Sequence, residues 1–342
     1  MKVAVIGLGA IGGLVAAYLK SKGVDVVTVG RLEQKKQIER LGLAIEGVRG
    51  TALVYTDVQT RLEEKVDLAI LTVKTQDLRD AVDKSRDFLV NGPLILSTQN
   101  GVRADKLLGM MLGPENLVSS IVMFGATYVP YHRVVHNFEG NWLIGRPSGR
   151  NDEAVARIVD VLKVAFEAVP VENIAGMKWT KVFVNASNCI PAVLGKSMQE
   201  TYADPAMCGW ALKILKEGFD VVDALKIELL DMPGFEVQKL KGLASMPVEQ
   251  AAPIYSGIMT KLSGEPLYGS ILQSIQRGRP SEIDFVNGEF ANQAKTHGID
   301  AKLNTRITEL VHKVEASKTF LTHEELNRDL ERMSQAARED FF

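Results

Sequence analysis

Cysteine is scarce in this sequence, and long apolar runs are missing. The 342 residues include two cysteines, Cys189 and Cys208, and no C-x-x-C pair. A disulfide scaffold and a cysteine-based zinc or redox site are therefore excluded. No apolar stretch reaches the ~18–20 residues that a transmembrane helix needs. Because the first predicted strand begins at Lys2 and leaves no room for a signal peptide, we expect a cytoplasmic protein without a membrane partner.

An excess of charge of either sign is missing as well. Lys and Arg number 40 against 42 Asp and Glu, which gives a formal net charge of −2 and a pI of about 6.3. A near-neutral chain has no global electrostatic reason to bind nucleic acid, so we expect no such partner. His132 and His136 have i, i+4 spacing, but the segment between them has a strand or loop pattern, which argues against a metal pair.

Strand and helix patterns alternate in the first half of the chain. Lys2–Gly7 is a β-branched run ended by glycine, Ala10–Lys22 has apolar residues at helical spacing, and Asp25–Val29 is a second strand. Such a unit has parallel strands and a right-handed crossover. Further apolar runs at Val66–Val73 and Leu94–Thr98 predict buried strands with helices on both faces of the sheet.

Strand patterns end near residue 172, and helical patterns follow. Two alternating segments, Leu117–Thr127 and Val134–Ile144, are predicted at the far edge of the sheet. The predicted helices of the second half are Met177–Leu194, Met207–Leu225, Glu249–Thr260, Ser281–Gly298, Asn304–Ser317 and a charged, solvated helix over Thr322–Glu339. At ~100–200 residues per domain, we predict an α/β chain with a Rossmann-type doubly wound sheet at residues 1–172 and an all-helical domain at residues 173–342.

A G-x-G-x-x-G motif lies between the first predicted strand and the first predicted helix. Its residues are Gly7, Leu8, Gly9, Ala10, Ile11 and Gly12. The first glycine permits a tight turn, the second lets the backbone approach a pyrophosphate, and the third lets helix and strand pack closely. The helix N-terminus offers N–H groups to the phosphates. The motif in this place predicts a dinucleotide site, and the alternative is a tight turn without a ligand.

The end of the second predicted strand distinguishes NADP from NAD. An NAD site normally has an acidic residue there for the ribose 2′-hydroxyl, but this chain has Gly30 and Arg31. A guanidinium can pair with a 2′-phosphate through two hydrogen bonds, which favours NADPH. Lys35 and Lys36 add charge nearby. Glu33 opposes this interpretation unless it points to solvent, and Arg31 alone is equally compatible with a solvated surface arginine.

Polar residues follow two further predicted strands. Lys74 follows the strand Val66–Val73, and Gln99 and Asn100 follow Leu94–Thr98. Ligands of open α/β sheets bind outside the carboxyl ends of the strands. We therefore expect Lys74 at the cofactor and Gln99 or Asn100 near the nicotinamide or the substrate. The alternative for Asn100 and the glycine after it is a plain turn.

A polar stripe is predicted on the helix that opens the second domain. At 100° per residue, Asn185 and Asn188 fall about 40° and −20° from Lys181. The stripe lies within an apolar stretch, so it either faces solvent or lines a cavity. A buried lysine would need a partner, and its lowered pKa would suit it to general acid catalysis.

Ser270 and Glu282 lie in a second polar segment, GSILQSIQRGRPSEIDFVNG. Ser270 is compatible with an ordinary helix start. Ser281 is a candidate cap for the next helix, and Glu282 with Asp284 would then complement its dipole. These structural roles compete with a role in a site.

Taken in order, these motifs resemble the ketopantoate reductase family (2-dehydropantoate 2-reductase). The resemblance extends to about Val314. It rests on GLGAIG at residues 7–12, Arg31, TVK ending at Lys74, QNG at residues 99–101, K-x-x-x-N at Lys181 and Asn185, and GS-x-L-Q…R-x-x-E-I-D-x-x-N-G over residues 269–288. It implies hydride transfer from NADPH to the 2-keto carbon of ketopantoate, which gives D-pantoate for pantothenate and coenzyme A synthesis.

The resemblance also implies roles for the candidate residues of the helical domain. Lys181 resembles the general acid that protonates the developing alkoxide, which its charge also stabilises. Glu282 resembles the residue that holds the substrate hydroxyl. Asn185 and Ser270 resemble substrate-binding residues, with Ser270 directed at the carboxylate.

In the first domain the resemblance implies contacts with the cofactor. Lys74 and Arg31 resemble cofactor-binding residues, with Arg31 at the 2′-phosphate, and Asn100 resembles the residue that joins cofactor and substrate. The expected site lies between the two domains, where closure would align the reactants.

Two departures from the family pattern fall among the substrate residues. The family usually has a second asparagine eight residues after the lysine, where this chain has Cys189, and Asn188 precedes it as a possible replacement. Ser274 replaces an acidic residue. The alternatives are therefore a different branched or hydroxylated 2-keto acid, or a non-catalytic NADP-binding protein. The apolar helices of the second domain are compatible with a homodimer, and equally with a helical core.

Overall fold

The protein consists of two compact units. Its structure is a computed structural model, which describes residues 1–90 and 92–339, with side chains described as far as Met333. The first unit is Met1–Lys178 and the second is Trp179–Phe342. The division falls inside helix α7 (Ile174–Ala186), a few residues beyond the boundary proposed from the sequence.

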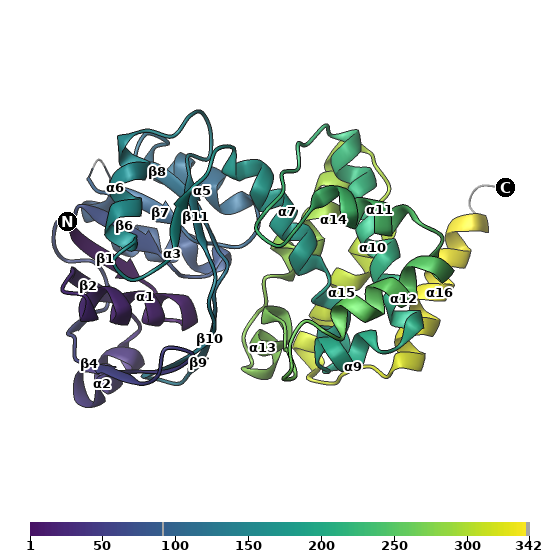
Figure 1. Ribbon diagram of the computed structural model, residues 1–342, viewed down its shortest axis with the longest axis horizontal. Coiled ribbons are helices and arrows are strands. Elements are labelled where there is room, and N and C mark those ends of the chain that lie inside the picture. The colour runs from purple at the N-terminus through teal and green to yellow at the C-terminus, as the bar shows by residue number, and fades with distance from the viewer. Residues whose placement is uncertain (91, 340–342) are drawn as a thin grey trace. The chain divides into compact units, whose positions relative to one another are not determined.

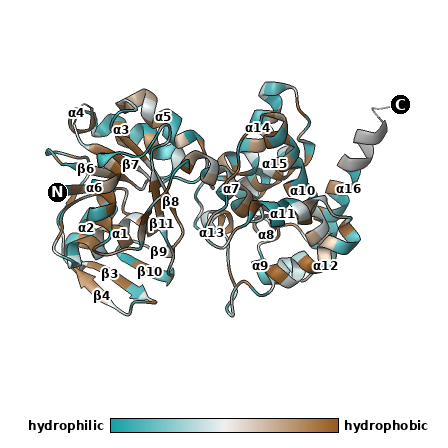
Figure 2. Ribbon diagram, turned by 45° about the horizontal axis from the view of Figure 1, so that its top comes forward, coloured by the Kyte–Doolittle hydropathy of each residue, from teal (hydrophilic) through white to brown (hydrophobic). Residues whose placement is uncertain are grey.

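A mixed sheet forms the centre of the first unit. Among the described residues its strands are, in spatial order, β12 (Ala168–Pro170), β11 (Trp142–Gly145), β8 (Leu117–Val122), β7 (Leu94–Ser97), β6 (Leu68–Leu71), β1 (Lys2–Ile6), β2 (Asp25–Val29) and β5 (Val58–Gln59). Neighbouring strands are parallel except β8 and β11. Hydrophobic residues dominate the central strands (Figure 2). The predicted doubly wound sheet is confirmed.

Helices cover both faces of this sheet. Along β1, Val3 and Val5 pack in the core that contains α1 (Ala10–Ser21) and α6 (Glu153–Leu162). Ala4 and Ile6 point to the opposite core, which contains α3 (Leu78–Lys84) and α5 (Arg103–Leu112). Because both faces are buried, these strands are continuous apolar runs without polar alternation. The remaining helices of this unit are α2 (Leu32–Leu41), η1 (Thr75–Asp77) and α4 (Arg86–Leu89).

A second sheet packs on the outer side of α1 (Figure 1). Its order is β4 (Ala52–Val54), β3 (Leu43–Gly47), β10 (Arg133–Phe138) and β9 (Gly125–Val129). The prediction that residues 117–144 form the far edge of the main sheet is therefore right for β8 and β11 and wrong for β9 and β10. The apolar side chains of β10 bury against α1, where a Cβ on Gly13 would lie 2.8 Å from Val134 Cγ2.

A buried histidine lies in an aromatic cluster of this unit. His136 is 1% exposed, and its Nδ1 is 3.1 Å from the Tyr18 hydroxyl. Its Nε2 has no hydrogen-bond partner among the described residues, and the Glu139 carboxylate is 3.9 Å away. Burial lowers the pKa of His136, which the nearby Glu139 only partly offsets. The ring is therefore neutral in the folded protein near pH 7.

This histidine predicts a loss of stability in mild acid. A buried histidine with a lowered pKa is protonated more readily in the unfolded chain. The free energy of unfolding should therefore fall as the pH drops below the ordinary histidine value of about 6.5, by up to about 1.4 kcal/mol per pH unit. Denaturation of wild type and His136→Gln between pH 5 and 8 measures the difference. Parallel curves for the two proteins would contradict the prediction.

The second unit is helical, as predicted. After α7 its elements are α8 (Cys189–Leu194), α9 (Met198–Tyr202), α10 (Pro205–Ala224), α11 (Val237–Ser245), α12 (Val248–Met259), α13 (Ser270–Gln276), η2 (Ile283–Phe285), α14 (Asn287–His297), α15 (Lys302–Ser317) and α16 (His323–Glu339). The prediction of a solvated last helix is wrong for its first part. Leu326 and Leu330 of α16 are fully buried, and Asn327 accepts a hydrogen bond from Trp210 Nε1 at 2.8 Å.

The predicted helix over residues 177–194 is two helices. In a continuous helix the Ser187 carbonyl would accept from the N–H of residue 191, but that residue is Pro191, which has none. The Tyr202 hydroxyl donates to this carbonyl instead, at 2.5 Å. The Tyr255 hydroxyl bonds the Ser187 Oγ at 2.6 Å. Two buried tyrosines thus stabilise the break between α7 and α8.

Candidate active site

The three glycines of the β1–α1 turn have three different environments. Gly7 has φ +108°, and a Cβ there would lie 2.7 Å from Val73 N. A Cβ on Gly12 would lie 1.9 Å from the Gly7 carbonyl oxygen, so helix and strand are in closest contact there. A Cβ on Gly9 would have no neighbour within 4 Å. The first and third glycines therefore serve the turn and its packing, and the second leaves open space beside the backbone, as a pyrophosphate requires.

The N-terminus of α1 is suited to an anion. Gly9 is its N-cap, no side chain within the described residues caps it, and its first turn contains no acidic residue. The first N–H groups of a helix lack intrahelical partners and carry a partial positive charge. These groups can hold the phosphates of a dinucleotide.

A buried glutamine joins this turn to the residue that follows β2. Gln34 Oε1 accepts from the Arg31 backbone N–H at 3.0 Å. Its Nε2 donates to the Leu8 carbonyl and, at 2.9 Å, to the Tyr128 hydroxyl. Gln34 therefore fixes the start of α2 against the glycine turn. This residue was not predicted from the sequence, although a glutamine at the third position of a helix is a known capping signal.

The Arg31 guanidinium lies at the surface beside Asp77. Its side chain is 60% exposed and 3.5 Å from the Asp77 carboxylate. An exposed pair at this distance contributes little, so a phosphate can replace Asp77. Glu33 is exposed, as the NADPH interpretation requires. Lys35, in contrast, is engaged with Glu39 and with the Val58 carbonyl.

The carboxyl ends of β1, β6 and β7 bring three candidate segments to one edge. These strands are parallel neighbours, so the glycine turn, Lys74 and Asn100 all follow strand ends on the same side. Lys74 and Asn100 are half-buried. Gln99 is not available as a ligand, because its Nε2 donates to the carbonyls of Leu71 and Val73 at 2.7 and 2.8 Å. Asn100 therefore stays the candidate of this pair.

In the second unit the predicted stripe is shorter than expected. Lys181 and Asn185 lie one turn apart on α7, and both are half-buried. Asn188 lies beyond the end of α7 as the N-cap of α8, so the helical angle does not apply to it. Its side chain contacts Gly269, where a Cβ would lie 2.7 Å from Asn188 Oδ1. This contact brings Asn188 close to Ser270, the exposed first residue of α13.

The two departures from the family pattern have packing roles. Cys189 is buried in α8, and burial raises the pKa of its thiol to about 12, which makes it unreactive. The Ser274 hydroxyl donates to the Ser270 carbonyl at 2.9 Å within α13.

A second lysine on α7 is already paired. Lys178 is 3% exposed, and its Nζ is 2.8 Å from Asp105 Oδ2. Asp105 also accepts from the Ser119 hydroxyl at 2.6 Å. Removing one partner of such a buried pair is strongly destabilising. Lys178 is therefore structural.

Glu282 precedes a short 3₁₀ turn, η2, and does not lie on the predicted helix. Its carbonyl accepts from Phe285 N–H at 2.9 Å, and Ser281 Oγ accepts from Ile283 N–H at 3.2 Å. The expectation that Glu282 complements the dipole of a long helix is therefore wrong, since α14 begins at Asn287. The Glu282 side chain is half-buried.

A buried polar network anchors the start of α14. Asn287 Nδ2 donates to Asn304 Oδ1 at 3.1 Å. Asn304 Nδ2 in turn donates to the Ile214 carbonyl and to Glu217 at 3.0 and 2.7 Å. Burial raises the pKa of Glu217, although it accepts several hydrogen bonds. The asparagine of the E-I-D-x-x-N-G motif is thus a structural residue.

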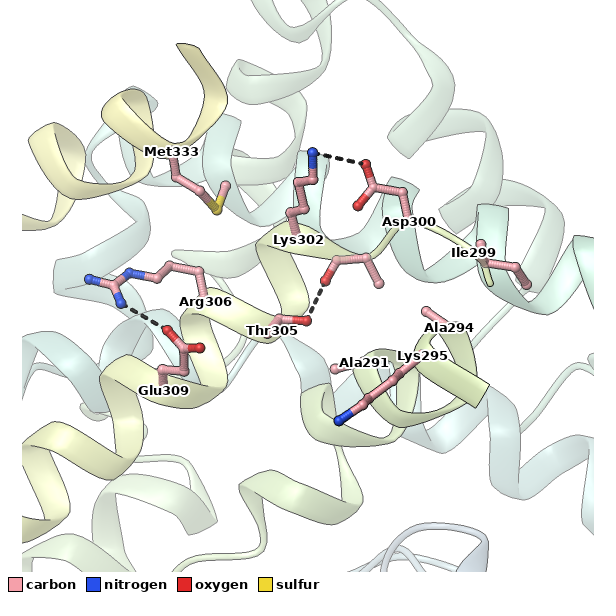
Figure 3. A pocket seen from close by; sticks show the side chains of 11 residues that line it. Ala291, Ala294, Lys295, Ile299, Asp300, Lys302, Thr305, Arg306, Glu309 and Met333 are labelled. Atoms are coloured by element: carbon pink, nitrogen blue, oxygen red, sulfur yellow. Dashed lines mark hydrogen bonds and ion pairs between the residues drawn. The ribbon is translucent and has the colours of Figure 1, made fainter. Parts of the chain in front are cut away.

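A surface pocket of about 430 Å³ lies among α14, α15 and α16 (Figure 3). None of the predicted site residues line it. Four of its charged side chains pair within it, Arg306 with Glu309 and Lys302 with Asp300. Among the described residues there is also no group of histidine, cysteine or acidic side chains that could hold a metal. Nor does any described helix have the length and apolarity to cross a membrane.

Known protein families match both units of the chain. The family described as "Ketopantoate reductase PanE/ApbA" matches residues 3–149, and its C-terminal part matches residues 173–315. The 2-dehydropantoate 2-reductase of Pyrococcus horikoshii is 32% identical over 91% of this chain and 96% of its own. The 2-dehydropantoate 2-reductase of Archaeoglobus fulgidus is 28% identical over 92% of this chain and 98% of its own.

Solved structures share the fold of the whole chain. A D-mandelate dehydrogenase with NADH and anilino(oxo)acetate has a TM-score of 0.80 at 22% identity, covering 93% of this chain and 99% of its own. A ketopantoate reductase from Ralstonia eutropha has a TM-score of 0.77 at 23% identity, covering 92% and 99%. From the two matching family segments and the 32% identical relative, this chain belongs to the ketopantoate reductase family.

Proposed function

We propose that this protein reduces ketopantoate to D-pantoate with NADPH. The observation that carries the proposal is the N-terminus of α1 behind Gly9, which no side chain of the described residues caps, together with the Arg31 backbone, which Gln34 links to the same turn and whose guanidinium is exposed. The helix N-terminus can bind a pyrophosphate, and the Arg31 guanidinium can bind a 2′-phosphate. Membership of the family, and relatives named 2-dehydropantoate 2-reductase, support the choice of substrate.

The residues of this chain fit the cofactor at several points. The N–H groups at Gly9 to Ile11 would hold the pyrophosphate, and Arg31 the 2′-phosphate. Lys74 and Asn100 would contact the cofactor at the carboxyl ends of β6 and β7. When bound, NADPH supplies the hydride that adds to the 2-keto carbon.

Lys181 is proposed as the general acid. Its ammonium donates a proton to the keto oxygen as that oxygen becomes an alkoxide, and its charge stabilises the transition state. Glu282 accepts a hydrogen bond from the substrate hydroxyl. Asn185, Asn188 and Ser270 bind the substrate, with Ser270 at the carboxylate. The contact of Asn188 with Gly269 supports placing Asn188 and Ser270 in one substrate-binding group.

A second candidate is the reduction of another branched or hydroxylated 2-keto acid. The observation that favours it is the place of Asn188. It lies at the break between α7 and α8, whereas the family asparagine stands one residue later. The D-mandelate dehydrogenase with the same fold shows that such a fold also occurs in a dehydrogenase of a different name.

The location of the protein and its oligomeric state are also proposals. We place the protein in the cytoplasm, where a soluble biosynthetic reductase would act. We also retain a homodimer through the helical unit, for which the exposed Ile254 and Ile258 on α12 offer an apolar surface.

A panel of 2-keto acids tests the function. We expect purified protein to oxidise NADPH rapidly with ketopantoate, and NADH much more slowly, when absorbance is followed at 340 nm. Turnover of another 2-keto acid alone would select the second candidate. Tight NADPH binding without turnover of any acid in the panel would contradict both.

A further inference from the structure

The turn that carries Glu282 is held on both sides by side chains of α15. The residue before Glu282 donates its backbone N–H, that of Ser281, to Glu315 Oε1 at 2.7 Å. Two residues after Glu282, Asp284 Oδ1 is 2.9 Å from His312 Nε2. His312 Nδ1 is 3.0 Å from Glu315 Oε2, which closes the arrangement. One histidine and one glutamate on α15 therefore form a clamp around Glu282.

This clamp requires a charged histidine. Both ring nitrogens of His312 face carboxylate oxygens, and carboxylates only accept hydrogen bonds. Each nitrogen must therefore carry a proton, as in the imidazolium ion. The groups that hold it are Asp284 from η2 and Glu315 from α15 itself. Burial lowers the pKa of His312, but the hydrogen bonds and charges of both carboxylates outweigh burial and raise it overall.

We propose that His312 and Glu315 are positioning residues that hold Glu282 in place to accept the hydroxyl group of the substrate. This inference rests on the proposed function. Neither residue needs to touch the substrate, because both act through the backbone and the flanking residues of the Glu282 turn. They make the enzyme selective for a keto acid that carries a hydroxyl.

Loss of one proton from the His312 ring removes one of the two hydrogen bonds that its nitrogens donate. A neutral imidazole has one donor and one acceptor nitrogen, so one carboxylate would then face a lone pair. The turn would lose a hydrogen bond on the Asp284 or the Glu315 side. The rate that depends on the substrate hydroxyl should therefore fall as pH rises through the pKa of His312, which lies above the ordinary histidine value.

Two substrates that differ only in the hydroxyl separate positioning from general stability. Ketopantoate carries the hydroxyl, and 3,3-dimethyl-2-oxobutanoate is the same acid without it. We expect His312→Gln to lower kcat/KM for ketopantoate by about tenfold to a hundredfold, the effect of a lost hydrogen bond to a charged group. The value for the analogue should change less than about twofold. The matched control is His297→Gln, since His297 is exposed on α14 and, within the described part of the chain, bonds only the Gln293 carbonyl.

A second variant keeps the test informative if His312→Gln folds poorly. Glu315→Gln retains an acceptor for the Ser281 N–H but removes one negative charge from His312. The amide N–H of this variant can donate to Nδ1 of a neutral His312 while Nε2 still donates to Asp284, so the ketopantoate-specific rate should no longer fall as the pH rises through the range where the wild type loses it. An equal loss of rate with both substrates, or an unchanged pH profile, would overturn the clamp.

Failure of the proposed function has a different signature. If the wild type reduces neither acid, the proposed function is wrong. Hydrogen exchange of the backbone amides then tests whether His312 and Glu315 hold the Glu282 turn. The amides of residues 281–286 should exchange faster in His312→Gln than in His297→Gln. Equal exchange in the two variants would overturn the clamp independently of any activity.

Discussion

Replacing Lys181 by alanine should reduce turnover of the keto acid by about 10³-fold while NADPH binding changes little. General acid catalysis contributes ~10²–10⁴-fold, and the same ammonium stabilises the developing alkoxide. Lys178 is not a substitute for Lys181, because its ammonium is buried against Asp105. Steady-state rates and NADPH fluorescence titration measure the two quantities separately.

The control for this experiment is an exposed lysine of the same unit. Lys239 on α11 pairs only weakly, since it and Glu236 are both exposed. Lys239→Ala should retain the wild-type rate. Full activity of Lys181→Ala would remove Lys181 from the mechanism, and weakened NADPH binding in that variant would give it a role in binding instead.

Replacing Arg31 by alanine should weaken NADPH binding by about tenfold to a hundredfold and leave NADH binding nearly unchanged. Hydrogen bonds to a charged phosphate contribute about 1.5–3 kcal/mol, and NADH lacks this phosphate. The turn itself should persist, because Gln34 bonds the Arg31 backbone and not its side chain.

A neighbouring cation provides the matched control for Arg31. Lys36 is exposed on α2, and Lys36→Ala removes a charge of the same sign. If this variant weakened NADPH as strongly as Arg31→Ala, a general positive field would explain the preference. Equal losses of NADPH and NADH in Arg31→Ala would contradict the 2′-phosphate role.

The parts of the fold that were predicted correctly depend on residues close together in the sequence. The β1–α1–β2 unit and its glycine turn depend on neighbours within about 30 residues, so periodicity and glycine spacing reveal them. The strands buried on both faces were visible as apolar runs. The pairing of β3 with β10 was not visible, because it joins Ala44 to Arg133. Register between such distant segments is decided by packing against α1.

The errors in the helical unit also have distant causes. The break after α7 depends on hydroxyls of Tyr202 and Tyr255, which no helical pattern around Ser187 contains. The first part of α16 was assigned to solvent because charge dominates its composition, yet Leu326 and Leu330 at i, i+4 spacing are buried.

The candidate site was predicted from motifs more fully than from residue chemistry. The glycine turn and Arg31 followed from physical argument, whereas the roles of Lys181 and Glu282 came from resemblance and stay predictions. Gln34 and His312 were missed, since each acts through contacts with the backbone or side chains of other elements. Such positioning residues become visible only when the fold is known.

The proposed reaction transfers a hydride from NADPH to the keto carbon of ketopantoate. A direct test incubates the protein with ketopantoate and NADPH that carries two deuterium atoms at C4 of the nicotinamide, so that either face delivers the label. We expect D-pantoate with a single deuterium at C2, observed by NMR and mass spectrometry. Unlabelled pantoate, or no pantoate while the protein binds NADPH tightly, would contradict it.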